Sequence, residues 1–352
     1  MTVTGPPILE VSNLHVSFAT EDGTVSAVDG VSFSVAAGEV VAIVGESGSG
    51  KSVTAMTLLG LTRGTNARIR GEARFEDTEL VEATPAQLQR IRGAGIAMVF
   101  QDPMSSLDPV YRVGDQIVEQ IRVHETDVSK AQAYDRAVEL MERVGIPRAS
   151  ERLRSYPHEF SGGMRQRVMI AMALSCSPRL LIADEPTTAL DVTIQAQILD
   201  ELRRLRDETN AGVILVTHDL GVVADIADRV VVMYAGRVVE QGTLDDIFYD
   251  PQHPYTWGLL GSITRVDADR SERLPAIAGM PPSLLNPPKG CHFRPRCPHA
   301  FDRCTEVPEL VNRVPDRPGS LDRCFLGVED KRRLRQVGDQ IGLASSSEAV
   351  AR

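Results

Sequence analysis

Alternating apolar and polar positions mark the N-terminal segment of the chain. Between residues 8 and 35 the alternation has the period of a strand with one buried face, and turn residues at 21–23 and 37–38 interrupt it. Tight turns between such segments are typical of neighbouring antiparallel strands. We therefore predict an antiparallel sheet at the start of the chain.

Four continuous apolar runs follow, at residues 40–44, 180–183, 213–216 and 230–233. A run without polar positions indicates a strand that is buried on both faces, as in the parallel sheets of α/β proteins. Segments with helical spacing separate these runs. The alternation of strands and helices predicts an α/β fold with a mixed or parallel sheet at its core.

Apolar residues recur at helical spacing between residues 116 and 144, which predicts a helical subdomain at about 102–176, between the first two core strands. After residue 242 proline becomes frequent, and four of the five cysteines follow. We therefore expect a main domain at 6–244 and a small Cys-rich C-terminal extension at 245–328. The charged and then serine-rich tail at 329–352 is expected to be loosely ordered.

The chain of 352 residues carries a formal net charge of −10. Because proteins bind nucleic acids mainly through Lys and Arg, this acidic balance argues against a nucleic-acid partner. Residues 1–10 lack the basic start and apolar run of a signal peptide, and the apolar runs are far shorter than the ~20 residues of a membrane span. We expect a cytosolic chain that reaches the cytoplasmic face of the membrane through partner subunits.

A glycine-rich segment directly follows the first apolar run. It fits the pattern GxxxxGK[ST], and a helical stretch at 53–61 comes after it. Strand, loop and helix in this order predict a phosphate loop, in which backbone N–H groups and the helix N-terminus hold the phosphates of ATP. Lys51 would contact the β- and γ-phosphates, and Ser52 would bind Mg²⁺. The predicted nucleotide-binding residues are Gly45, Ser47, Gly48, Ser49, Gly50, Lys51 and Ser52.

The second core strand ends in two carboxylates, Asp184 and Glu185. Acidic groups at the end of a buried strand are costly unless a cation or a proton-transfer task holds them there. We expect Asp184 to organise Mg²⁺, and Glu185 to accept a proton from the attacking water or to orient it.

Residues 160–167, FSGGMRQR, resemble the signature motif of ATP-binding-cassette (ABC) proteins and lie shortly before the acidic strand, as they do in that family. Phe160 stands where Leu is usual, and both are apolar. Other family elements match in the family's order. The resemblance implies a Q-loop at Gln101 that contacts Mg²⁺ and reports on the γ-phosphate, a D-loop at 189–191 that includes Asp191, a catalytic switch histidine at His218, and Phe18 as the aromatic residue stacked on adenine.

The same resemblance implies a partner subunit. Ser161, Gly162 and Gly163 would present a hydroxyl, N–H groups and a helix N-terminus to the γ-phosphate in the phosphate loop of an opposite subunit. Because the chain holds one phosphate loop and one signature, we expect a pair of ATPase subunits, with a paralogue favoured over an identical copy. ATP would close the pair and hydrolysis would reopen it.

Beyond residue 245 the chain resembles the C-terminal extension of the ATPase subunits of oligopeptide and dipeptide importers, at 253–256, 279–282 and 290–297. This resemblance implies peptide import through two membrane permeases, fed by an extracellular substrate-binding protein. Nickel and other small solutes are alternative substrates within the family. A soluble ABC ATPase that acts on ribosomes or DNA is a rival, but the chain lacks the second cassette or the long coiled coil of such proteins.

Four cysteines of the extension, separated by five, six and nineteen residues, predict a metal centre that stabilises a segment with little apolar core. Zinc sites usually contain close Cys-x₂₋₄-Cys pairs, which are absent here, whereas a [4Fe–4S] cluster accepts varied spacings. Some members of the importer family carry such a cluster. We favour a [4Fe–4S] cluster over zinc, with a metal-free or disulfide-bonded segment as a third alternative. A structural role for the cluster is favoured over redox sensing, which is the other open role. The predicted ligands are Cys291, Cys297, Cys304 and Cys324.

Other predictions concern residues outside this set of ligands. His292 and His299 are expected to be bystanders, and Cys176, which lies in an apolar stretch, is expected to be a core residue. The cations that would offset the negative charge of a thiolate-bound cluster are Arg294, Arg296, Arg303 and Arg323.

Overall fold

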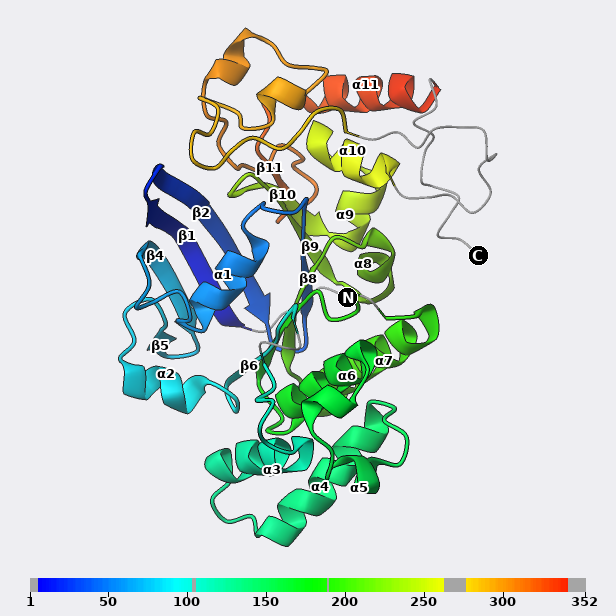
Figure 1. The fold of residues 1–352 in the computed structure, drawn as a ribbon. Helices are drawn as coiled ribbons and strands as arrows, with labels where there is room; N and C mark the ends of the chain where they lie inside the picture. The colour runs from blue at the N-terminus through cyan, green and yellow to red at the C-terminus, as the bar shows by residue number, and fades with distance from the viewer. Residues whose placement is uncertain (1–5, 103–105, 189, 263–276, 341–352) are drawn as a thin grey trace. The chain divides into compact units, whose positions relative to one another are not determined.

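The computed structural model describes residues 6–102, 106–188, 190–262 and 277–340, and the chain contains two compact parts (Figure 1). The first part consists of the described residues of Met1–Leu9, Ser34–Val40 and Arg74–Val216. The second consists of those of Glu10–Phe33, Val41–Ala73 and Thr217–Arg352. Both parts contain segments that are far apart in the sequence.

Parallel strands form the centre of the first part. β7 (Leu180–Asp184) pairs on one side with β6 (Ile96–Val99) and on the other with β8 (Gly212–Thr217). Every residue of these strands is buried, as expected for strands covered on both faces. Asp184 is the last residue of β7 and therefore lies at the edge of the sheet where the parallel strands end.

Helices occupy the chain between β6 and β7. They are α3 (Val113–His124), α4 (Lys130–Arg143), α5 (Ala149–Arg152) and α6 (Gly162–Leu174), and Figure 1 shows the first three gathered in one group. These helices lie between the apolar runs at residues 40–44 and 180–183, and β6 lies between the first of these runs and the helices. The other helices of this part are α2 (Pro85–Ile91) and α7 (Val192–Thr209).

The second part contains a mixed sheet. β9 (Arg229–Tyr234) pairs in parallel with β3 (Val40–Val44) and antiparallel with β10 (Arg237–Thr243). β10 also pairs antiparallel with the short strand β11 (Leu321–Asp322). Helices α1 (Lys51–Leu58) and α8 (Leu220–Ile226) belong to the same part.

A separate four-stranded sheet has the order β2-β1-β4-β5. Its strands are β1 (Pro7–Thr20), β2 (Gly23–Ala36), β4 (Ala67–Phe75) and β5 (Thr78–Glu79). β4 and β5 are antiparallel, and most residues of the three longer strands lie in the second part. The mixed sheet and this additional sheet confirm the α/β core and the antiparallel subdomain of the predicted fold class.

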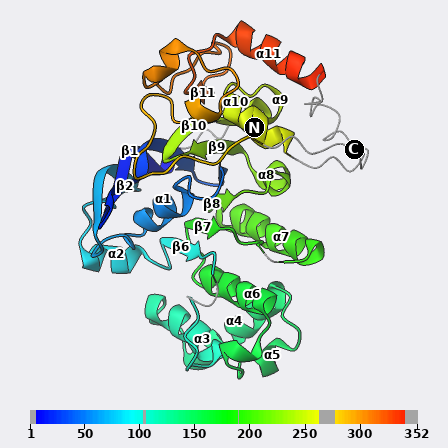
Figure 2. The same cartoon turned by 45° about the horizontal axis from the view of Figure 1, so that its top comes forward.

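The C-terminal extension does not form a compact part of its own. Its helices α9 (Leu244–Tyr249) and α10 (Pro254–Gly261) lie beside β10 and β11 in Figures 1 and 2. The rings of Tyr255 and Phe293 pack against Tyr234 of β9, with centroids 4.5 and 5.3 Å away. Extension and strand therefore share one core, because the extension alone has too few apolar residues to build one.

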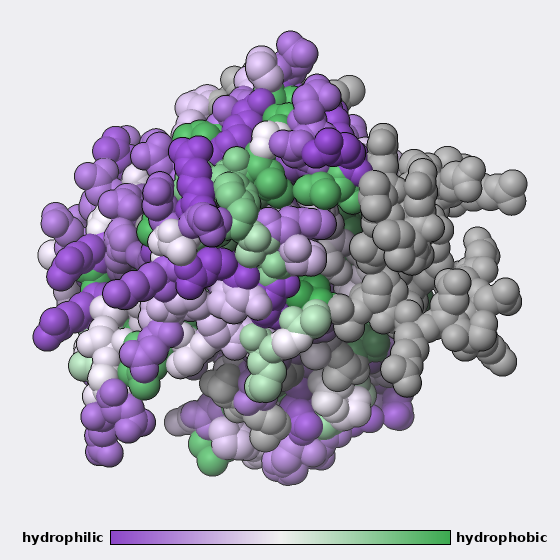
Figure 3. All heavy atoms as spheres, turned by 90° about the horizontal axis from the view of Figure 1, so that it is seen from above, coloured by the Kyte–Doolittle hydropathy of each residue, from purple (hydrophilic) through white to green (hydrophobic). Residues whose placement is uncertain are grey.

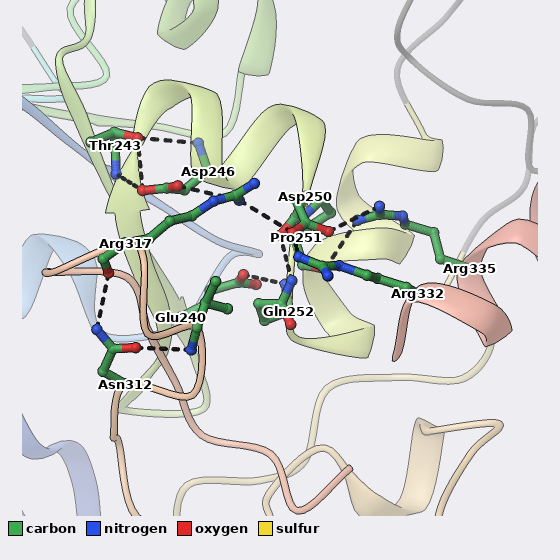
Figure 4. Close-up of polar contacts among 11 residues, drawn as sticks. Glu240, Thr243, Asp246, Asp250, Pro251, Gln252, Asn312, Arg317, Arg332 and Arg335 are labelled. Carbon is green, nitrogen blue, oxygen red and sulfur yellow. Dashed lines mark hydrogen bonds and ion pairs between the residues drawn. The ribbon is translucent and has the colours of Figure 1, made fainter. Parts of the chain in front are cut away.

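The tail differs from its expected loose order up to residue 340. Helix α11 (Val328–Gln340) begins directly after the extension, and residues 341–352 lie outside the described residues. Ion pairs hold the helix. Lys331 lies 2.6 Å from Asp322. Arg332 and Arg335 lie 2.9 and 3.0 Å from Asp250, as Figure 4 shows. The charges that suggested a solvated tail instead bind acidic residues of the extension.

Hydrophilic residues predominate on the face shown in Figure 3, with smaller hydrophobic areas among them. Within the described ranges, none of the helices combines the length and the apolar character needed to cross a bilayer.

Candidate nucleotide site and cysteine pocket

The predicted phosphate loop connects β3 to α1 in the second part. Its backbone requires glycine at two positions. Gly45 has φ +153° and Gly50 has φ +101°, and an added Cβ would lie 2.1 Å from the carbonyl oxygen of Met233 and 2.4 Å from that of Ala27, respectively. A side chain at either position would collide with backbone. The loop is therefore closely packed on the side that faces the protein.

The other side of the loop is suited to phosphate. A Cβ added at Gly48 would meet no atom within 4 Å, and Ser49 Oγ is buried without a hydrogen-bond partner among the described residues. Lys51 Nζ donates to the carbonyl oxygens of Gly45 and Glu46, at 2.7 and 3.1 Å. An ammonium group held inside a glycine-rich loop at a helix N-terminus fits an anionic ligand.

Two further predicted nucleotide residues belong to the second part. Ser52 is the second residue of α1, and Phe18 lies near the end of β1; both side chains are half-buried. His218 follows β8 directly and is exposed, beside Asp219, whose carboxylate caps α8.

The acidic residues belong to the first part. Asp184 is buried at the end of β7, and Glu185 follows with φ +49°, which is unusual for a residue other than glycine. The Glu185 N–H donates to Val216 O at 2.8 Å, and its carboxylate accepts hydrogen bonds from Gln101 Nε2 at 3.1 Å and Thr188 Oγ1 at 3.0 Å. The structure thus brings Gln101 to Glu185, as needed for a joint role. Thr188 had no assigned role in the sequence analysis.

The predicted signature lies at the start of α6, also in the first part. Ser161 is the N-cap and accepts a hydrogen bond of 3.3 Å from Met164 N–H. Ser161 and Gly162 are exposed, and a Cβ at Gly162 would meet no atom within 4 Å. Gly163 is half-buried near Leu190. The free N-terminal turn of a 13-residue helix can receive an anion from outside this part.

Asp191 has a local structural role. Its carboxylate accepts a hydrogen bond of 3.0 Å from Ile194 N–H and caps α7. Ala189, the first residue of the expected D-loop, lies outside the described residues.

All four cysteines of the extension line one small pocket. None forms a disulfide. Burial raises the pKa of Cys297 to about 12 and that of Cys324 to about 11. Within the described part of the chain, no three His, Cys, Asp or Glu side chains are placed to hold a single metal ion.

The arginines near the cysteines have other partners than we expected. Only Arg294 lines the cysteine pocket. Arg296 binds Glu46, Arg303 lies over the ring of Phe325 at 4.4 Å, and Arg323 donates to Val238 O at 2.8 Å. Arg323 also lies close enough to Cys291 for their charges to interact, whereas Arg296 is engaged in the ion pair with Glu46.

The structure also shows the surroundings of the two histidines near the cysteines and of Cys176. His292 Nδ1 lies 2.9 Å from Ala235 O, and His299 lines the pocket beside Trp257. Cys176 is buried, as expected of a core residue, and burial raises the pKa of its thiol.

Two family models match the chain. The model of the ABC transporter family matches residues 28–188, and the model described as oligopeptide/dipeptide transporter, C-terminal region, matches residues 239–304. The first match contains the phosphate loop, the signature and the acidic strand. The second contains three of the four extension cysteines.

Curated relatives resemble the chain over most of their length. The oligopeptide transport ATP-binding protein OppD of Salmonella typhimurium is 53% identical over 92% of this chain and 95% of its own. The dipeptide transport ATP-binding protein DppD of Bacillus subtilis is 54% identical over 85% of this chain and 89% of its own.

Among solved structures, a dimeric ATP-binding cassette bound to ADP and phosphate after hydrolysis aligns with a TM-score of 0.62 and 27% identity. The alignment covers 67% of this chain and 98% of the cassette. An ATP-binding subunit of an ABC transporter aligns with a TM-score of 0.56 and 30% identity, over 68% of this chain and 91% of its own.

Proposed function

The chain belongs to the ATP-binding subunits of ABC transporters, in the group that serves oligopeptide and dipeptide import, and on this premise we propose how its residues divide the work. It is a peptide-transport ATPase that converts ATP and water into ADP and phosphate. The hydrolytic role rests on the position of Glu185. This residue follows a buried strand, and its carboxylate accepts hydrogen bonds from Gln101 and Thr188.

The proposed roles follow the family resemblance, residue by residue. Lys51 and the N–H groups of residues 45–52 bind the β- and γ-phosphates, and Phe18 stacks on adenine. Ser52, Gln101 and Asp184 hold Mg²⁺, which offsets phosphate charge when bound. Glu185 accepts a proton from water as the water oxygen bonds to the γ-phosphorus and the bond to the β,γ-bridging oxygen breaks. His218 holds the γ-phosphate and the water in line.

A second ATPase subunit completes each site in this proposal. The exposed turn at Ser161 and Gly162 binds the γ-phosphate in the partner's phosphate loop, and Asp191 belongs to the same interface. The dimeric state of a solved cassette related at 27% identity supports such a pair. A paralogue is favoured over a second copy of this chain.

The proposed complex contains two membrane permeases and an extracellular substrate-binding protein, and places this chain at the cytoplasmic face of the membrane. The test is to co-purify the chain from membranes with its permeases and partner ATPase, reconstitute them in proteoliposomes, and measure ATP-driven uptake of labelled peptides. Peptide uptake supports the proposal; uptake of nickel or another small solute without peptide uptake would refute it.

The cysteine pocket is proposed to hold a [4Fe–4S] cluster. Its four thiols fit this group in chemistry, because thiolates are the usual cluster ligands. A single zinc ion would bring thiolates to about 3.8 Å from one another, given a Zn–S distance of about 2.3 Å. The spacing of the four cysteines, which contains no close Cys-x₂₋₄-Cys pair, is the reason for preferring the cluster over zinc.

Metal analysis tests this assignment directly. After anaerobic purification we expect about four iron and four sulfide ions per chain, and loss of iron in a Cys304→Ser variant. The matched control is Cys176→Ser, outside the pocket, which should retain the iron. One zinc per chain, or no metal, would overturn the assignment.

A further inference from the structure

A carboxylate stands in the phosphate loop at Glu46. Its two oxygens accept hydrogen bonds from the guanidinium group of Arg296, from Nη1 at 2.6 Å and from Nη2 at 3.1 Å. The two residues are 250 positions apart, and Arg296 belongs to the C-terminal extension. A bidentate pair of this kind fixes the direction of the carboxylate as well as balancing its charge.

The Arg296 side chain is itself fixed. It is 5% exposed, and its Nε donates to Ala278 O at 3.0 Å, its Nη2 to Ile277 O at 3.1 Å and its Nη1 to Tyr234 Oη at 3.3 Å. With these donors engaged, the guanidinium cannot turn to another partner without losing several hydrogen bonds. Arg296 therefore holds Glu46 in one orientation.

A second residue of the extension contacts the same loop position. The Glu46 N–H donates a hydrogen bond of 2.8 Å to the hydroxyl of Tyr255, a fully buried residue of α10. Side chain and backbone of Glu46 are thus both attached to the extension. The other contacts of the loop described above come from the core of the second part.

An unpaired carboxylate at this position would oppose the function of the loop. ATP brings several negative charges to the loop, and like charges a few ångströms apart repel in a partly buried site. The Glu46–Arg296 pair carries no net charge, and the carboxylate is directed toward the guanidinium group. The loop can then receive phosphate without a competing negative field.

We propose that Arg296 is a positioning residue of the nucleotide site, which neutralises and orients Glu46 so that the phosphate loop accepts ATP. Tyr255 supports it by fixing the Glu46 backbone. The C-terminal extension is thereby part of the ATP-binding apparatus of this chain. This inference rests on the proposed nucleotide role of residues 45–52.

A double-mutant cycle on the full chain tests the inference. Arg296→Gln should weaken Mg-ATP binding by about tenfold, because it leaves a carboxylate beside the phosphates. In the Glu46→Gln background the same change should weaken binding less than about twofold, because there is no carboxylate left to neutralise. Binding is titrated with a fluorescent ATP analogue, and thermal unfolding is recorded for each variant. Arg303→Gln, elsewhere in the extension, is the matched control and should bind normally.

A merely structural Arg296 would give the same loss in both backgrounds, and that result would overturn the inference, as would normal binding by Arg296→Gln. If Arg296→Gln does not fold, Arg296→Lys serves in its place. Arg296→Lys should weaken Mg-ATP binding about threefold in the unmodified chain and not at all in the Glu46→Gln background. Equal effects in the two backgrounds would overturn the inference. Failure of the unmodified chain to bind ATP would instead refute the proposed nucleotide role.

Discussion

The side-chain amide of Gln101 donates a hydrogen bond of 3.1 Å to the carboxylate of Glu185, 84 residues further along the chain. Gln101 follows β6 and Glu185 follows β7, and these strands are neighbours in a parallel register. Because the carboxyl ends of parallel strands meet at one edge, the sheet itself brings the two side chains together. The general base of the proposed reaction is thus held by the residue that the family resemblance assigns to sensing the γ-phosphate.

Ser161 should affect hydrolysis without affecting ATP binding by its own chain. A Ser161→Arg substitution places a bulky side chain on an exposed helix N-terminus, which we propose binds the partner's nucleotide. We expect unchanged ATP affinity for the isolated chain, and at least about a hundredfold lower turnover in the assembled complex. Ser150→Arg, on the exposed surface of α5, is the control. Weakened ATP binding by the isolated chain would show that the signature does not act across an interface.

Two glycines of the phosphate loop should differ in their tolerance of alanine. At Gly50 a Cβ would lie 2.4 Å from Ala27 O, whereas at Gly48 it would meet no atom within 4 Å. Both have positive φ, so backbone strain of about 1 kcal/mol applies to both. We expect Gly50→Ala to lower the free energy of unfolding by at least about 2 kcal/mol more than Gly48→Ala, measured by urea denaturation. Equal losses would contradict the packing described for the loop.

Helix α11 should depend on its buried ion pair. Lys331→Ala leaves Asp322 buried, with Arg313 Nη1 at 3.3 Å as a remaining partner. The expected loss is about 3 kcal/mol in the free energy of unfolding. Arg333→Ala, in the same helix but 73% exposed, should change it by less than about 0.5 kcal/mol. Similar effects of the two substitutions would show that the helix is not anchored through Lys331.

Glu240 should make stability depend on pH. Its side chain is buried and accepts hydrogen bonds from the N–H groups of Gln252 and His253 (Figure 4 shows the first), and burial raises the pKa of its carboxyl from 4.5 to about 8. Because the folded-state pKa lies above the unfolded one, the stabilising contribution is complete below pH 4.5 and is lost as pH rises through 8.

Glu240→Gln removes this titration. Its melting temperature should exceed that of the unmodified chain by several degrees at pH 9, and the difference should nearly vanish at pH 5. Glu309→Gln, at an exposed position, should have no such effect. A constant difference between the two pH values would contradict the raised pKa.

The sequence predicted those features that depend on local pattern. The apolar runs identified β3, β7, β8 and β9, because strands buried on both faces are apolar except near their ends. The phosphate loop was recognisable because its glycines and Lys51 have fixed spacing. The tail at 329–340 was misjudged, since its helix depends on acidic partners that no local pattern reveals.

Contacts across long stretches of sequence were not predictable. Arg296 was assigned to the cysteines because it precedes Cys297, yet it binds Glu46, and Tyr255 reaches the same residue across 209 positions. Such pairs are set by the packing of the extension on β9, which a single sequence does not show. The gathering of the four cysteines in one pocket, in contrast, was expected from the sequence.

The most direct test of the account is a Glu185→Gln variant in the reconstituted transporter, assayed for ATP binding, ATP hydrolysis and peptide uptake together. Glu151→Gln, at an exposed position of α5, is the control. We expect ATP affinity within about twofold of normal, with hydrolysis and uptake both reduced by at least about a hundredfold, because the water loses its proton acceptor. Normal hydrolysis by the Glu185→Gln variant would contradict the account.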